Sequence, residues 1–307
     1  MYIEQALVGN NRWWRVLLTT LATAGIFIIN FITYLLMPKE AVDASYDVMK
    51  SWPSSIALLV NLIPFVILLA LLFTMVYTLH QRNILSLTTT RKQVDFKRIG
   101  FSLALVMGLN LASFAFSYAC DSSTISWNFH PIPFLVLCLI SIMLFPFQIG
   151  FEEFLFRGYL MQQIGILAKN KWVPLLITSV VFGVFHSANP EVAKMGFGVM
   201  FFYIGTGFLL GIMTLMDDGL ELALGFHLGN NLIAALLVTS DFSALHTDAL
   251  FKLSGKVPPS ESLQEMVISM VVLYPIILLT FAKKYQWHHW KSKLFGTLNK
   301  TTRINHD

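Results

Sequence analysis

Three ionisable side chains interrupt one long apolar run of this sequence. Glu152, Glu153 and Arg157 lie in a hydrophobic stretch that resumes directly after them. Each such group costs about 2.5 to 3.5 kcal/mol at the centre of a membrane helix, so we expect all three to face a bundle interior and to act there. Glu153 and Arg157 are four residues apart, share a helix face and can form an ion pair. Glu152 then points about 100° away, free to enter a cavity as a general base.

Imidazole and carboxamide groups lie in two later apolar runs. His186 is near the end of one run, while His227 and Asn231 are four residues apart in another and share a helix face. If the chain forms an antiparallel helical hairpin around Asn170-Lys171, Glu152 and His186 differ in depth by only about one helical turn. By the same rise per residue, His227 lies roughly 12 Å from the start of its own run. All these groups can therefore reach one cavity.

The composition places most of the chain in lipid. Of 307 residues, 56% are hydrophobic and 12% are charged, against about 25% charged in an ordinary soluble domain. Because backbone groups in a bilayer must pair within the protein, the expected fold is an all-α, polytopic membrane bundle. No repeat or long linker divides residues 1–307, which favours a single membrane domain. About eight spans are predicted, near residues 16–37, 55–79, 99–119, 133–166, 172–189, 195–216, 219–240 and 266–282.

The positions of the basic residues predict an orientation. An even number of spans puts both termini on one side, and lysine and arginine gather in the second connection and after the last span. We therefore expect a multi-pass protein of the cell membrane with both termini in the cytoplasm. The formal charge of +4 comes without a recognisable nucleic-acid-binding motif, so no nucleic acid partner is expected. The basic residues that set the orientation are Arg82, Arg91, Lys92, Lys97, Arg98, Lys283, Lys284, Lys291 and Lys293.

Three other polar residues receive structural interpretations or none. Asp217 and Asp218 precede an apolar run and are predicted to cap its helix at the N-terminus. His80 lies at the end of a predicted span and is given no function.

Three short motifs together resemble a known family. In chain order they are Glu152-Glu153-xxx-Arg157, Phe182-xxx-His186 and His227-xxx-Asn231. They resemble the motifs of the CPBP family, which includes the type II CAAX prenyl endopeptidases, and the resemblance covers a catalytic core of about 145–240. The family implies an intramembrane endopeptidase in which Glu152 activates water and His186 assists the proton transfer or positions that water. It implies that His227 and Asn231 stabilise the oxyanion, while Phe182 is read as a core residue.

A metal mechanism is the alternative within this class. Glu152, His186 and His227 could instead hold a divalent ion such as zinc. The sequence has no His-Glu-x-x-His motif, asparagine is a poor zinc ligand, and the two cysteines lack zinc-site spacing. A glutamate mechanism without a cofactor is therefore favoured, and the metal mechanism stays open.

The expected partners are the lipid bilayer and a hydrophobic, membrane-associated or lipidated peptide, which would enter from the cytoplasmic side or laterally. Two other classes stay open. One is a non-catalytic membrane protein, such as a bacteriocin-immunity or scaffold protein. The other is a proton-coupled transporter that uses Glu152 and the histidines as a relay, although the sequence shows no paired halves of the kind many transporters have.

Overall fold

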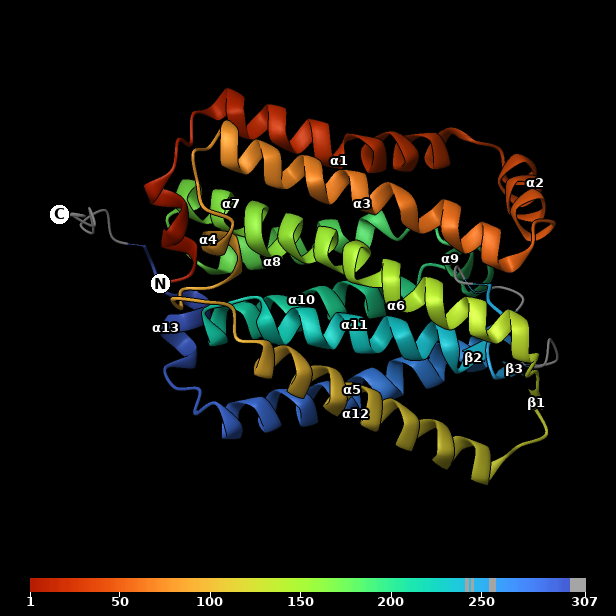
Figure 1. Cartoon of the computed structure of the whole chain (residues 1–307). Coiled ribbons are helices and arrows are strands. Elements are labelled where there is room, and N and C mark those ends of the chain that lie inside the picture. The colour runs from red at the N-terminus through yellow and green to blue at the C-terminus, as the bar shows by residue number, and fades with distance from the viewer. Residues whose placement is uncertain (241–242, 244–245, 254–257, 299–307) are drawn as a thin grey trace.

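The protein is a bundle of long helices that run roughly parallel to one another (Figure 1). The computed structural model describes residues 1–240, 243, 246–253 and 258–298. Six helical segments in this part are long and apolar enough to cross a membrane, which confirms an all-α, multi-pass membrane protein. They are α1 (Trp13–Leu36), α3 (Ser54–Thr78), α5 (Phe96–Cys120), the continuous segment Pro131–Ala168, α10 (Val199–Asp217) and α12 (Pro259–Lys284).

Two shorter helices, α8 (Trp172–Phe185) and α11 (Glu221–Leu236), run along the bundle beside these six segments. Helix α8 is about 21 Å long, less than the roughly 30 Å of a hydrocarbon core. The sequence predicted this helix through residue 189, but it ends at Phe185. His186 therefore lies where the chain leaves the helix inside the bundle.

The expected hairpin between the fourth and fifth spans is confirmed. Helix α7 (Met161–Ala168) ends at Lys169, whose φ of 56° is left-handed, and α8 follows after two more residues. The Asn170 side chain accepts a hydrogen bond of 2.9 Å from the backbone of Val173, which closes the turn. The two arms are thereby held antiparallel.

The fourth span changes its helical geometry beside the two glutamates. Helix α6 (Pro131–Glu153) passes into a π-helical turn, η2 (Phe154–Leu160), and continues as α7. A π-turn adds a residue to the helical repeat and is frequent at functional sites. Here the turn begins directly after Glu153 and contains Arg157.

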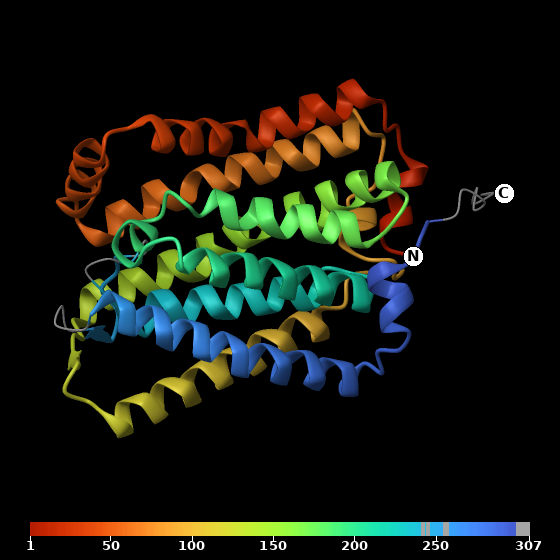
Figure 2. The same ribbon diagram turned by 180° about the vertical axis from the view of Figure 1, so that it is seen from behind.

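Helix α11 occupies the middle of the bundle, in contact with α5, α6 and α10. Gly225 and Gly229 face α5, and a side chain at Gly229 would meet the carbonyl oxygen of Leu103 at 3.0 Å. Small residues four apart allow two membrane helices to approach closely. This approach fixes the position of His227, which lies between the two glycines. Helices α10 and α12 are in contact on the side of the bundle that Figure 2 shows from behind.

Short elements cover both ends of the bundle (Figure 1). One end carries α2 (Lys39–Lys50), α9 (Pro190–Met195) and a three-stranded sheet of order β1-β3-β2, formed by β1 (Ile125–Trp127), β2 (Val238–Thr239) and β3 (Phe251–Leu253). The other end carries η1 (Ile3–Val8), α4 (Leu85–Thr88) and α13 (Trp290–Phe295). The first and last described helices thus lie at the same end.

The prediction that Asp217 and Asp218 cap α11 is wrong. The residue before α11 is Leu220, and no side chain caps the helix. Asp217 instead accepts from Arg91 at 2.9 Å and from Arg98 at 2.5 Å, and Asp218 pairs with Lys293. These ion pairs tie α10 to α5 and α13 at the end of the bundle that carries the N-terminal helix.

Candidate active site

A buried ion pair lies at the base of the site. Arg157 donates to Oε1 of Glu153 across 2.9 Å, and both side chains are fully buried, which confirms the pair expected from their spacing. A second guanidinium nitrogen donates to the carbonyl of Gly207 on α10 at 3.2 Å. The guanidinium carbon also lies 4.3 Å from the ring centre of Phe182 on α8, a cation–π contact. Arg157 therefore joins three helices.

His227 completes this cluster from α11. Its Nδ1 lies 2.8 Å from Oε1 of Glu153, the same oxygen that accepts from Arg157. Because a carboxylate oxygen only accepts, Nδ1 carries a proton. The other ring nitrogen, Nε2, lies 3.7 Å from Oε2 of Glu152. Glu153 thus aims the imidazole of His227 at Glu152.

Glu152 is buried yet keeps a free oxygen. Its Oε1 accepts from the carboxamide of Gln148 at 3.3 Å, whereas Oε2 makes no hydrogen bond within the described residues. Three further buried polar atoms around it also lack a partner there, namely Oε1 of Gln148, Oε2 of Glu153 and Nε of Arg157. Buried polar atoms in native proteins are nearly always hydrogen-bonded, to protein or to water. Their concentration here gives the site unused capacity to bind polar groups.

His186 has a free ring nitrogen that can accept a hydrogen bond. Its Nδ1 lies 2.7 Å from the carbonyl oxygen of Phe182, so Nδ1 is protonated and Nε2 of the neutral ring carries a lone pair. The ring centre of Phe182 is 4.6 Å from that of His186 and 6.0 Å from that of His227. Phe182 therefore contacts both imidazoles, in addition to packing in the core.

The position of Asn231 depends only on its place in α11. It lies one turn beyond His227 on α11 and is partly buried. Its side chain makes no hydrogen bond in the part of the chain that the structure describes. The structure thus joins Glu152, Glu153, Arg157 and His227 by direct contacts and links His186 to them through Phe182.

Sequence reasoning missed Tyr203. Its ring stacks on His186 with 4.5 Å between the ring centres and 26° between the planes. Its hydroxyl accepts from the Asn189 carboxamide at 3.0 Å, and the backbone of Asn189 donates to the carbonyl of His186 at 3.0 Å. A tyrosine in an apolar run looks like a core residue. The only available signal was the Asn189-Pro190 pair, which is typical of a turn.

The motif residues do not converge as metal ligands. Among the residues that the structure describes, no three His, Cys, Asp or Glu side chains are arranged to hold an ion. The side chains of Glu152, His186 and His227 do not fit a zinc site in this arrangement, since zinc needs at least three converging protein ligands.

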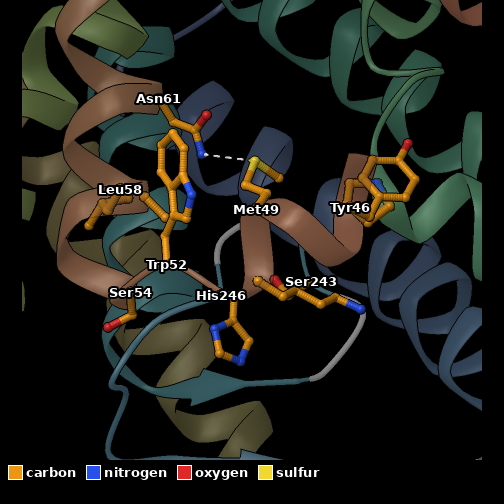
Figure 3. A pocket seen from close by; sticks show the side chains of 11 residues that line it. Tyr46, Met49, Trp52, Ser54, Leu58, Asn61, Ser243 and His246 are labelled. Atoms are coloured by element: carbon orange, nitrogen blue, oxygen red, sulfur yellow. Dashed lines mark hydrogen bonds between the residues drawn. The ribbon is translucent and has the colours of Figure 1, made fainter. Parts of the chain in front are cut away.

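A separate groove lies between α2, the start of α3, Ser243 and His246 (Figure 3). Tyr46 and Trp52 line it, and so do Asn61 and His246, but none of the motif residues does. The hydroxyl of Tyr46 donates to the carbonyl of Ala188 at 2.6 Å. Helix α2 is thereby anchored two residues after His186.

The segment that contains the three motifs is similar to a known family of proteins. Residues 131–233 match the family described as type II CAAX prenyl endopeptidase, Rce1-like, and all three motifs fall in this range. The segment that builds the site therefore matches this family model, and the resemblance is confirmed. Over 293 residues, the chain is 26% identical to the uncharacterized protein YyaK of Bacillus subtilis (strain 168). The aligned region covers 93% of this chain and 95% of that protein. No solved structure matches the chain.

Proposed function

We propose that this protein is an intramembrane endopeptidase that hydrolyses a peptide bond by means of water activated by Glu152. The observation that carries the proposal is the free Oε2 of Glu152, which is buried and faces the imidazole of His227 at 3.7 Å. A carboxylate in such a place can remove a proton from water without competition from a fixed partner.

In the proposed reaction, the water oxygen attacks the carbonyl carbon of the substrate while its proton passes to Glu152. The lone pair on Nε2 of His186 accepts a hydrogen bond from the second hydrogen of the water and orients the attack, because Nδ1 already donates to the carbonyl of Phe182. When the C–N bond breaks, the protonated Glu152 returns its proton to the leaving amine. The carboxylate is then restored.

His227 and Asn231 supply the donors for the oxyanion. Nε2 of His227 donates only when the ring is protonated, because Nδ1 already donates to Glu153. The negative charge of Glu153 stabilises that charged ring, although Arg157 shares the same oxygen. A donor aimed at the developing oxyanion contributes about 3 to 4 kcal/mol in a dry site. The two histidines thus have opposite roles, set by the partner of each Nδ1.

The proposed substrate is a hydrophobic, membrane-associated or lipidated peptide, because the site lies within apolar helices. We further propose that the chain acts as one membrane domain of the cell membrane, with both termini in the cytoplasm. The basic residues between α3 and α5 and after α12 support this orientation.

The test is cleavage of quenched hydrophobic and prenylated peptides by protein purified in detergent. Glu152→Gln should lower the rate by about 10² to 10⁴, the usual contribution of a general base. Glu265→Gln, the same change at an exposed position of α12, should leave the rate unchanged. Activity that resists a chelator supports the glutamate mechanism, whereas loss of activity with the chelator would favour a metal. Full activity of Glu152→Gln would contradict the proposal.

A further inference from the structure

Glu152 is held by a residue that belongs to none of the three motifs. Gln148 lies one helical turn before Glu152 on α6, and its Nε2 donates to Oε1 of Glu152 across 3.3 Å. This is the one hydrogen bond that the Glu152 carboxylate makes with the described residues. The other carboxylate oxygen, Oε2, faces His227. The contact with Gln148 therefore determines which oxygen of Glu152 stays free.

The ion pair beside Glu152 holds its own members but not Glu152. Oε1 of Glu153 accepts from Arg157 and from Nδ1 of His227. Glu152 shares no hydrogen bond with this cluster, since Nε2 of His227 stays 3.7 Å from it. A glutamate side chain rotates about several bonds, so its carboxylate does not keep one orientation without a fixed donor. The orientation of Glu152 therefore depends on Gln148.

The chemistry of the two groups fixes the direction of the carboxamide. An ionised carboxylate only accepts, so the NH2 group of Gln148 must face Glu152. Oε1 of Gln148 is left as a buried acceptor without a partner in the described part of the chain. Polar side chains in membrane helices commonly hold neighbouring helices together by hydrogen bonds. The hydrogen bond of Gln148 stays within its own helix, so joining helices does not explain this polar residue near the middle of the apolar segment Pro131–Ala168.

We propose that Gln148 is a positioning residue that holds the carboxylate of Glu152 for the reaction. This inference rests on the proposed function. The bond from Nε2 to Oε1 restricts the rotation of the carboxylate and leaves Oε2 to take the proton from water. A reacting group displaced by about 1 Å can lose about 10² in rate. Gln148 thus acts through Glu152 and need not touch the substrate.

Cleavage kinetics distinguish positioning from substrate binding. Gln148→Met keeps the length of the side chain and removes the donor, so kcat should fall by about 10- to 100-fold while KM stays about the same. Gln148→Glu keeps the size but replaces the donor with an acceptor, and kcat should fall at least as far. Gln264→Met, the same change at an exposed position of α12, should leave both constants unchanged. The melting temperature of Gln148→Met in detergent should stay close to that of the wild type, because Gln148 joins no other helix.

Infrared spectroscopy measures the contact without relying on cleavage. The carboxylate band of Glu152 is the one that disappears from the spectrum of the Glu152→Gln protein. Because a charge-assisted hydrogen bond polarises the carboxylate, this band should shift in Gln148→Met. It should stay in place in Gln264→Met.

The outcomes separate the two proposals. A shifted band without cleavage by the wild type supports the contact and contradicts the proposed function. Cleavage by the wild type with kcat unchanged in Gln148→Met overturns the positioning role, as would an unshifted band. A loss of activity matched by a lower melting temperature would show a structural role and would also overturn it.

Discussion

Nδ1 of His227 donates to Oε1 of Glu153 across 2.8 Å, from one central helix to another. Because the same oxygen accepts from Arg157, the orientation of the imidazole depends on an ion pair whose two side chains are fully buried. In the proposed reaction, the two adjacent glutamates therefore differ in role. Glu152 faces the proposed water, and Glu153 positions the group opposite to it.

Glu153→Leu should destabilise the protein by about 3 to 5 kcal/mol, because Arg157 would remain as an unpaired buried charge. Adding Arg157→Met removes that charge and should restore most of the stability. Activity should stay low in both variants, since His227 lacks its acceptor in each. Thermal unfolding in detergent and peptide cleavage measure the two effects. Recovery of activity in the double variant would contradict a positioning role for Glu153.

The stacked pair of Tyr203 and His186 predicts that the ring matters more than the hydroxyl. An aromatic pair contributes about 0.5 to 1.5 kcal/mol, so Tyr203→Leu should lower kcat/KM by roughly 2- to 12-fold and alter its pH profile. Tyr203→Phe keeps the stack and should stay close to wild type. Phe201→Leu, at an exposed neighbour, serves as the matched control. Equal losses in Tyr203→Phe and Tyr203→Leu would point to the hydroxyl instead.

The parts of the site that were predictable depend on local spacing. The Glu153–Arg157 pair follows from a separation of four residues, and the hairpin follows from Asn170-Lys171 between two apolar runs. The π-turn after Glu153 has no such signal, because an apolar α-helix and an apolar π-helix read alike. Contacts between distant parts of the chain, such as Asp217 with Arg91, depend on how the helices pack.

The same limit explains why the significance of His80 was missed. It is fully buried, and its Nδ1 donates to the carbonyl of Asn10 at 2.9 Å. Its Nε2 lies 3.0 Å from the Tyr159 hydroxyl and 3.1 Å from that of Thr19, so either hydroxyl can donate to it. A protonated ring would lose this acceptor. His80 thus connects the N-terminal segment to the π-turn in its neutral form.

Burial lowers the pKa of His80 below its usual value of 6.5. The unfolded chain therefore binds a proton more readily than the folded one, and stability should be full above about pH 6.5 and fall as the pH drops below it. The melting temperature in detergent should therefore fall as the pH is lowered from about 7.5 to about 5.5. His80→Gln should reduce this dependence, while His288→Gln, at an exposed position, should not. Equal pH dependence in wild type and His80→Gln would contradict the assignment.

Cys120 offers a direct test of the proposed orientation. It is exposed at the last residue of α5, at the opposite end of this helix from the basic connection that precedes it. With cytoplasmic termini, Cys120 lies outside, so a membrane-impermeant maleimide should label it on intact cells. Cys138→Ser removes the other thiol, and Cys120→Ser should then abolish labelling. Lys92→Cys, added to the cysteine-free protein, should react only after permeabilisation, because Lys92 is exposed on the basic side. The reverse pattern would place the termini outside and move the basic connection to the external face.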